Sequence, residues 1–325
     1  TPHWRDQSTS TVALDDPAMI SVIFGIIKTC SNASPIGNGI CKAVEWLRND
    51  AKPLFALITT AVTGFAGAIE QILSAPAPWL LAPLVALIAA WRVSWGFGLF
   101  SLLGLNLVLF MGLWQQMIST LALVIAASLL ALLIGIPIGI LSARHQHAWA
   151  ITRPVLDLMQ TMPAFVYLIP AVMFFSTGLV PSAIATLIFS MPPVVRLTYL
   201  GIRQVPNDLI EAGRAFGCSE RQLLWKVQRP SALPTLMAGV NQTIMLALSM
   251  VVIASMIGGG GLGDVVLEGT NGLDVGTGFE GGLAVVILAV ILDRLTQSLA
   301  TTSSSKKTLQ QSFRSFRNLW TPIRP

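Results

Sequence analysis

The sequence predicts an all-α integral membrane protein with about seven transmembrane helices. Of its 325 residues, 54% are hydrophobic and only 11% are charged. One soluble core of that length could not bury so much apolar surface. A helix needs roughly 20 predominantly apolar residues to cross a bilayer, and the apolar residues are gathered in runs of about that length. We expect the seven spans at approximately 77–92, 97–114, 117–142, 158–179, 182–201, 236–257 and 281–299.

The segment before these spans is predicted to contain two parts. Residues 1–53 mix charged and polar residues with apolar patches too short to cross a bilayer, so we expect a tail outside the membrane. Residues 54–75 place apolar side chains at three- and four-residue steps, with Thr, Glu and Gln between them. This pattern predicts an amphipathic helix on the membrane surface. An additional span is the alternative, because the polar residues there are mostly uncharged threonines.

The basic residues of the connections predict the orientation of the spans in the 76–300 membrane domain. Cytoplasmic loops carry an excess of Lys and Arg. Arg144 and Arg153 flank one connection, and further basic residues populate the long connection at 203–234 and the tail at 301–325. These segments are therefore expected in the cytoplasm, and an odd number of spans leaves the N-terminus outside.

An outside N-terminus would place Cys30 and Cys41 in an oxidising compartment. A disulfide between them is allowed there, and two unrelated free cysteines are the alternative. The cysteines show neither CxxC spacing nor neighbouring histidines, so we expect no metal site. The net charge of +5 is spread over span ends and the tail. That distribution favours the lipid bilayer as the partner and excludes nucleic acid.

The most informative segment lies in the connection at 203–234. From Pro206 to Pro230 it reads PNDLIEAGRAFGCSERQLLWKVQRP. Asp208, followed by an acidic residue three positions later, is predicted to cap a short helix. Gly217 can end that helix in a left-handed conformation.

A second short helix is predicted directly after the first. Ser219 and Gln222 have the spacing of a capping box, and Pro230 is expected to close the unit. A short, self-capped helix held between two spans is what a membrane domain needs to transmit a movement from a soluble motor.

This loop resembles the EAA motif of permeases from bacterial ATP-binding-cassette importers of the binding-protein-dependent, MetI-like type. In that motif Glu-Ala-Ala is followed by Gly after three residues and by an Ile-x-Leu-Pro element after nine more. Three positions depart from the motif: Gly213 replaces Ala, Val227 replaces Ile and Arg229 replaces Leu. Glycine costs a helix up to about 1 kcal/mol relative to alanine, so we expect a looser helix. The chain keeps the spacing with Glu211, Ala212, Gly213, Gly217, Val227, Gln228, Arg229 and Pro230.

The resemblance implies that the first helix of the loop docks into a cleft on a separate ATPase subunit. The alternative is an ordinary amphipathic loop helix whose small residues allow local packing. No Lys is preceded by Gly, so the chain has no Walker A lysine, and ATP with its Mg²⁺ is expected on the partner ATPase. We expect this chain itself to bind no cofactor. The coupling residues implied by the resemblance are Asp208, Glu211, Ala212, Gly213, Phe216, Gly217 and Pro230.

Two further segments look like the corresponding stretches of glycine betaine/proline betaine permeases. They are DLMQTMPAFVYLIP, from Asp157 to Pro170, and MAGVNQTIMLALSMVVIASM, from Met237 to Met256. The similarity extends over roughly 76–300. It implies a MetI-like permease fold in a bacterial inner membrane. It also implies that two copies of the permease work with two ATPase subunits and a periplasmic solute-binding protein.

Four residues within the spans are candidates for lining a translocation pathway. Pro163 interrupts a span and frees backbone carbonyl groups. Phe165 and Tyr167 could offer aromatic faces to a quaternary ammonium solute, although aromatic residues in spans more often serve packing. Asn241 is expected to hydrogen-bond between helices, and it is also a pathway candidate.

The segment Gly258 to Gly263, GGGGLG, formally satisfies GxGxxG but opens no βαβ unit. We therefore exclude dinucleotide binding. A flexible outer gate formed by Gly258, Gly261 and Gly263 is one interpretation, and a plain turn is the other.

The sequence predicts a transporter subunit without catalytic residues. No Ser, His and Asp arrangement and no catalytic thiol signature is present, so we expect no enzyme activity in this chain. Ion-coupled carriers usually have ionisable groups near the middle of the bilayer, and these spans have almost none. The function we expect is ATP-driven import of glycine betaine, proline betaine or a related solute. The alternatives are a permease for choline, carnitine or methionine and, outside this class, an ion-coupled carrier or channel.

Overall fold

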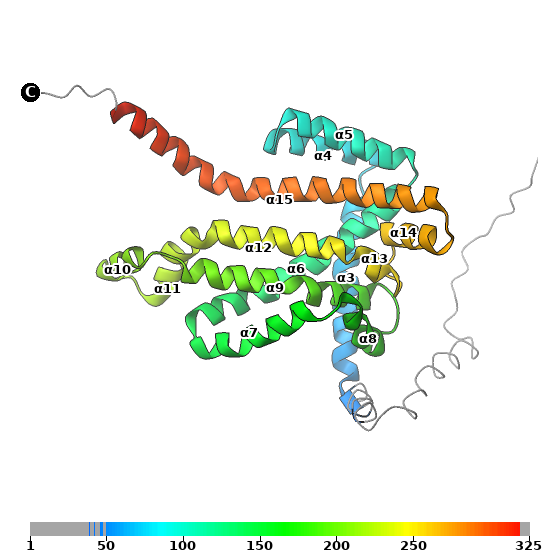
Figure 1. Ribbon diagram of the computed structural model, residues 1–325, viewed down its shortest axis with the longest axis horizontal. Helices are drawn as coiled ribbons and strands as arrows, with labels where there is room; N and C mark the ends of the chain where they lie inside the picture. Colours follow the sequence, from blue (N-terminus) through cyan, green and yellow to red (C-terminus); the bar gives the residue numbers. More distant parts are fainter. Residues whose placement is uncertain (1–38, 40–41, 43–45, 48–49, 319–325) are drawn as a thin grey trace, which may run out of the picture. The chain divides into compact units, whose positions relative to one another are not determined.

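The computed structural model describes residues 39, 42, 46, 47 and 50–318 (Figure 1). These residues form helices and, within this part of the chain, no strand. The chain divides after Leu57 into two compact units, and the architecture below is that of the second. Cys30 and Cys41 lie outside the described residues, as does almost all of the predicted tail. The helices are α3 (Lys52–Ser74), α4 (Pro78–Arg92), α5 (Trp95–Phe110), α6 (Trp114–Arg144), α7 (Gln146–Thr161), α8 (Ala164–Phe175), α9 (Leu179–Arg203), α10 (Asn207–Ala215), α11 (Glu220–Gln222), the π-helical η2 (Leu223–Gln228), α12 (Arg229–Ser249), α13 (Val251–Ser255), α14 (Leu262–Asn271) and α15 (Val275–Asn318).

Five of the described helical segments are long and apolar enough to cross a membrane. The predicted all-α membrane architecture is confirmed. The two spans predicted at 77–92 and 97–114 are α4 and α5, which are apolar but only 15 and 16 residues long. A sixth candidate span is the bent pair α7 and α8. The five segments are Lys52–Ser74, Trp114–Arg144, Leu179–Arg203, Glu220–Ser249 and Val275–Ser298.

The span predicted at 158–179 is not one continuous helix. α7 ends at Thr161, α8 begins at Ala164, and the two axes differ by 103°. Met162 has an extended backbone, with ψ 135°, because the ring of the following Pro163 excludes the helical conformation at the preceding residue. Pro163 was expected to interrupt this span, and the bend is larger than an interruption alone implies.

Helices α6, α9 and α12 form the centre of the bundle, and α15 lies beside α12 (Figure 1). α6 and α9 approach each other closely at Gly139. A β-carbon at that position would lie 2.8 Å from the backbone oxygen of Val195 and 2.6 Å from the β-carbon of Thr198. Small residues at such contacts are the usual means by which membrane helices pack, since lipid provides little hydrophobic force between them.

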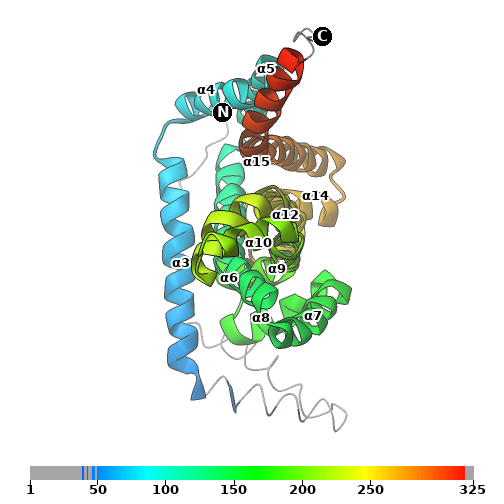
Figure 2. The ribbon, with the colours of Figure 1, turned by 90° about the vertical axis from the view of Figure 1, so that its left-hand side faces the viewer.

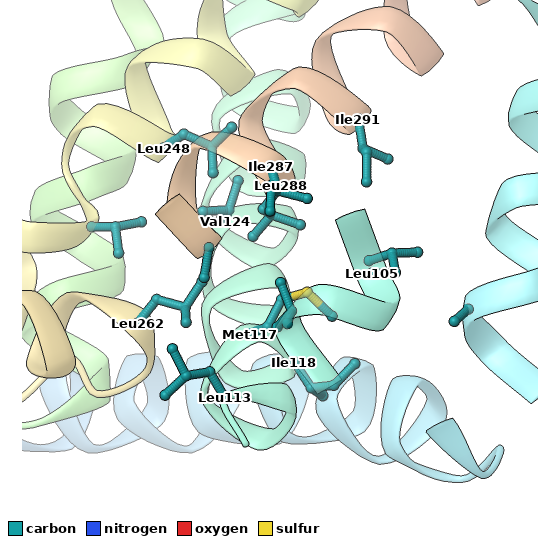
Figure 3. Packing of buried hydrophobic residues seen from close by; sticks show 14 of the residues in the cluster. Leu105, Leu113, Met117, Ile118, Val124, Leu248, Leu262, Ile287, Leu288 and Ile291 are labelled. Atoms are coloured by element: carbon teal, nitrogen blue, oxygen red, sulfur yellow. The ribbon is translucent and has the colours of Figure 1, made fainter. Parts of the chain in front are cut away.

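The largest apolar cluster joins α5, α6, α12, α14 and α15 (Figure 3). Ile118 and Leu262 are fully buried within it. Leu288 of α15 and Leu248 of α12 meet there, so the cluster holds together helices that are far apart in the sequence. α15 continues well beyond the predicted end of its span at 299.

From Ile58 onward, α3 runs across the axes of α9 and α12 rather than along them (Figures 1 and 2). Val62 packs against Leu123 of α6 and Val180 of α9, and the carboxylate of Glu70 accepts a hydrogen bond from Ser119 in α6. This orientation is the one expected of a helix on the membrane surface if the bundle spans the bilayer. Its length and hydropathy also suit a span, so the surface helix stays a prediction.

Candidate functional site

The loop that the sequence singles out forms a compact hairpin at one end of the bundle (Figure 1). We call residues Asn207–Gln228 the loop hairpin. It comprises α10, α11 and η2, and it joins α9 to α12. α13 and α14 lie at the other end of the bundle, so the hairpin is separated from the glycine-rich segment by the length of the central helices.

The first helix of the hairpin begins and ends at backbone signals. α10 begins at Asn207, and Asp208 lies in its first turn, so the predicted capping role of Asp208 is wrong. The helix begins two residues earlier than that cap would place it, because Pro206 supplies an extended backbone before it. At the other end, Gly217 has φ +75°, and the amide of Cys218 donates to the carbonyl of Gly213 over 3.1 Å. This Schellman arrangement confirms the predicted stop at Gly217.

The second half of the hairpin begins with the predicted capping box. The amide of Gln222 donates to Ser219 Oγ over 3.4 Å, and the amide of Ser219 donates to Gln222 Oε1 over 2.9 Å. Pro230 does not close the unit, which corrects the prediction: it lies in the first turn of α12, and the helix continues. The turn before it is π-helical, since the amide of Arg229 donates to the carbonyl of Leu224. Pro230 has no backbone N–H, and this wider turn lets the helix continue without a hydrogen bond from that residue.

Gly213 permits the two halves of the hairpin to pack closely. A β-carbon there would lie 2.7 Å from Cδ1 of Leu223. Leu223 and its neighbour Leu224 are buried, and Leu224 packs against Ile202 of α9 and Ala232 of α12. The departure from alanine at Gly213 therefore has a packing reason. The expected looseness of α10 is offset by the contact that the glycine allows.

The outer surface of the hairpin exposes large apolar side chains. Phe216 is 89% exposed and Trp225 is 57% exposed. The guanidinium of Arg229 lies 4.8 Å from the ring centre of Trp225, and Arg214 pairs with Glu220 at 3.4 Å. Every predicted coupling residue except the buried Gly213 is exposed. The exposed coupling residues are Asp208, Glu211, Ala212, Phe216, Gly217 and Pro230.

This arrangement is suited to binding another protein. Aromatic side chains surrounded by charged groups are typical of the energetically important centre of a protein interface. The hairpin is anchored through Leu224 to helices α9 and α12. A force applied to the exposed surface would therefore reach the central helices through a short, well-packed path.

The aromatic pathway candidates have different surroundings. Phe165 is 53% exposed and follows the exposed Pro163 at the start of α8. Tyr167 is buried; its hydroxyl donates to the backbone oxygen of Met159, and its ring meets Phe189 edge-on. The packing interpretation therefore fits Tyr167, whereas the ring of Phe165 is exposed.

Asn241 joins α12 to α15. Its Nδ2 donates to Asp293 Oδ1 over 3.0 Å, and its Oδ1 accepts a hydrogen bond from Thr296. Gln297 Nε2 donates to the same carboxylate oxygen over 2.7 Å. The expected hydrogen bonds between helices are present at Asn241, and their role is to hold the two helices together.

The glycine turn, Gly258–Gly263, is packed against three helices. Gly258 and Gly261 have φ of +86° and +77°. The amide of Leu262 donates to Thr120 Oγ1 of α6 over 2.8 Å, and the amide of Gly178 donates to the carbonyl of Ile257 over 2.7 Å. At Gly263 a β-carbon would lie 2.5 Å from the carbonyl oxygen of Val251 in α13. These glycines serve backbone conformation and close packing, and a gate role for them stays a prediction.

One charged pair was not foreseen. Arg153 and Asp157, four residues apart on α7, lie 3.9 Å apart, but Asp157 also accepts a hydrogen bond from Arg196 of α9. Asp157 and Arg196 are 39 positions apart in the sequence. Only the packing of α7 on α9 brings them together, so no local signal could have revealed the contact.

The part of the chain that the structure describes contains no group of three or more His, Cys, Asp or Glu side chains that could hold a metal ion. Two acidic groups outside the candidate spans have shifted pKa values. Burial is the main cause that raises the pKa of Asp264, which lies in α14. Hydrogen bonds from Thr277 and from the amide of Gly276 lower the pKa of Asp274.

Comparisons with known proteins agree with this architecture. The family model for the binding-protein-dependent transport system inner membrane component matches residues 135–303. The glycine betaine/proline betaine transport system permease protein ProW of Escherichia coli is 50% identical over 84% of this chain and 77% of its own length. The glycine betaine/carnitine transport permease protein GbuB of Listeria monocytogenes is 48% identical over 81% of this chain and 95% of its own.

A solved structure shows the same fold. An inward-facing conformation of the MetNI methionine ABC transporter superimposes with a TM-score of 0.54. The match covers 59% of this chain and 95% of that chain, at 21% sequence identity. The MetI-like fold expected from the sequence is therefore present.

Proposed function

The chain belongs to the family of binding-protein-dependent transport system inner membrane components, and from that membership we propose that it imports glycine betaine, proline betaine or a related quaternary ammonium solute. It is a non-catalytic membrane component of a transporter of the ATP-binding-cassette class. Relatives with about half of their residues identical are named for glycine betaine, which supports this solute class.

The loop hairpin carries the proposal of coupling to a separate motor. Phe216 and Trp225 are exposed, while Leu223 and Leu224 anchor the hairpin to the bundle. An exposed apolar surface on a rigid support is what a docking site needs. ATP and Mg²⁺ are bound by the partner ATPase, whose movement reaches α9 and α12 through the hairpin.

The complete importer in this proposal contains two copies of this chain, two ATPase subunits and a periplasmic solute-binding protein. The family description and the names of the relatives support an ATPase and a binding protein as partners. Closure of the motors would turn the pathway outward, so that the docked binding protein releases solute into it.

The chain is an inner membrane component, and we place the loop hairpin and the C-terminus in the cytoplasm and the N-terminus outside. Cys218 provides a test because it is a free, partly exposed cysteine in the hairpin. In a variant with Cys30→Ser and Cys41→Ser, an impermeant maleimide should label Cys218 only from the cytoplasmic side. Labelling from the outside of intact cells would contradict this orientation.

The proposed function is tested by uptake of labelled glycine betaine into proteoliposomes that contain this chain, its ATPase and its binding protein. We expect uptake only with ATP inside. Uptake without ATP would indicate an ion-coupled carrier instead. ATP turnover without betaine uptake would show that the solute is wrong, and choline, carnitine and methionine would be tested next.

A further inference from the structure

A charged pair joins α7 to α9 and has no part in the loop hairpin. We propose that Asp157 and Arg196 form a site for a zwitterionic solute, with its carboxylate at Arg196 and its ammonium group at Asp157. The inference rests on the proposed function, because it assigns residues of this chain to that solute. It goes beyond the function by naming where in the permease the two charges of the solute are recognised.

The pair bridges two helices and keeps part of its surface open. Arg196 Nη2 donates to Asp157 Oδ1, and the side chains are 33% and 50% exposed. Arg196 Nε is buried and, within the described residues, has no hydrogen-bond partner. The guanidinium group has more N–H donors than its bond to Asp157 uses, so its exposed part can bind a carboxylate.

The direction of the Arg196 side chain indicates that the pair faces protein or water rather than lipid. Arg196 lies in the candidate span α9, two turns before the helix ends at Arg203, about 10 Å along the helix axis. Charged side chains within membrane-spanning helices almost always face the bundle interior or a water-filled cavity. The Arg196 side chain extends sideways to Asp157 in α7 and not toward the end of α9. It therefore differs from long basic side chains that extend along their helix to the membrane surface. The open side of the pair is therefore best placed on the translocation pathway.

The chemistry of the pair matches that of a betaine. A betaine carries one carboxylate and one quaternary ammonium group. Its carboxylate can replace Asp157 as the partner of Arg196, and its ammonium group can replace Arg196 as the partner of Asp157. In the exchange each charge of the pair keeps an oppositely charged partner, so the solute replaces the ion pair without leaving either group unpaired. A quaternary ammonium group has no N–H to donate, so Asp157 would attract it by charge alone, while Arg196 would form directional hydrogen bonds with the carboxylate.

A purely structural role is the competing explanation. The rings of Trp149 in α7 and Tyr199 in α9 are stacked, with centres 3.7 Å apart and planes within 6°. Leu156 is buried against Val194 and Val195. These contacts already hold α7 on α9, and a half-exposed ion pair adds little to such a contact. The pair is therefore not needed as a clamp.

The test compares four variants in the complete importer reconstituted in proteoliposomes. Arg196→Gln, Asp157→Asn and the double variant with both changes should each lower betaine uptake about tenfold or more, since each removes a charge contact with the solute. Arg153→Gln is the matched control: Arg153 is 68% exposed and lies 3.9 Å from Asp157 on the same helix. Its uptake should stay within about twofold of the wild type.

The double variant separates recognition from structure. It replaces the ion pair by two amides of nearly the same shape, which can still hydrogen-bond to each other. If the pair were only a clamp, the double variant would recover the uptake that the single variants lose, and this result would overturn the proposal. Unchanged uptake in Arg196→Gln would also overturn it.

Solute length gives a readout that a clamp would not change. In the Asp157→Glu variant, the carboxylate reaches about one methylene further from α7, which shortens the space between the two charged groups when a solute lies between them. Uptake of a betaine with a longer chain between its two charges should then change by a different factor from uptake of glycine betaine. Equal factors would contradict the site. A wild-type complex that hydrolyses ATP without betaine uptake would contradict the proposed function and this site with it.

Discussion

The two ends of the bundle are built on opposite principles. The loop hairpin leaves Phe216 and Trp225 in solvent and keeps Gly217 in open space, with nothing within 4 Å of an added β-carbon. The glycine turn at the other end is tightly packed at Gly261, where an added β-carbon would lie 2.3 Å from Thr120 Oγ1. Both segments use glycine at positive φ. In the loop hairpin, Gly217 ends a helix beneath an exposed surface. In the glycine turn, Gly261 brings the backbone against the neighbouring helix α6.

This difference indicates which surface is incomplete in the isolated chain. The glycine turn has its hydrogen bonds and close contacts within the chain, through Thr120 and Gly178. The loop hairpin satisfies its backbone but not its apolar side chains. Substitutions in the turn should therefore act on stability, whereas substitutions on the hairpin surface should act on coupling to a partner.

The largest effect is expected for Gly261→Ala. The substitution meets both a left-handed backbone and Thr120, so the free energy of unfolding should fall by about 3 kcal/mol or more. Thermal unfolding of the purified protein in detergent measures the effect. Gly260→Ala is the control, since Gly260 has nearly the same φ, +75°, but no atom within 4 Å of the added carbon. A control that destabilises as much as Gly261→Ala would contradict the close contact.

Thr120→Val should destabilise by about 2 kcal/mol, because it leaves the buried amide of Leu262 without its acceptor. Thr186→Val makes the same change in α9. Thr186 is buried, and its hydroxyl has no hydrogen-bond partner among the described residues. The control should therefore be neutral or stabilising. Equal losses in both variants would show that the contact with Leu262 contributes nothing specific.

Gly217→Trp should leave the protein inserted and folded but lower ATP-dependent betaine uptake about tenfold. The new side chain has room in the isolated chain, although the positive φ at Gly217 costs a non-glycine residue about 1–2 kcal/mol. A loss of uptake per folded protein therefore arises from steric exclusion of the partner ATPase. Comparing uptake with the amount of folded protein in the membrane checks the prediction. Full transport by this variant would remove the hairpin from the coupling path.

Ser219→Ala should have the smallest effect, a loss of about 1 kcal/mol that is confined to the hairpin, because it removes one capping bond. Hydrogen exchange should become faster at Gln222 and remain unchanged in the glycine turn. Faster exchange at both ends would mean that the hairpin and the glycine turn unfold together. That result would contradict the contrast between the two ends of the bundle.

Sequence reasoning succeeded where the signal is local. The stop at Gly217 and the capping box at Ser219 depend on residues within a few positions, and both are present. The same reasoning placed the cap at Asp208, two residues late, since Pro206 already sets the extended backbone. It also let a span continue through Met162, although the restriction on a residue before proline was available.

Contacts between distant segments were beyond that reasoning. The pair of Asp157 with Arg196 and the bond of Thr120 to Leu262 depend on how α7 and α9, or α6 and α14, pack together. Composition shows that these helices belong in a membrane but not which faces meet. The buried position of Tyr167 follows from the same packing.

The most direct test of the account measures betaine uptake and ATP hydrolysis together in proteoliposomes that carry Phe216→Ala. Phe110→Ala is the matched control, because Phe110 at the end of α5 is exposed to the same 89% but lies outside the hairpin. The account predicts that Phe216→Ala lowers uptake and solute-stimulated hydrolysis about tenfold or more with unchanged stability, while Phe110→Ala changes neither. Uptake by Phe216→Ala equal to that of the wild type would contradict the central claim that the exposed hairpin surface receives the motor.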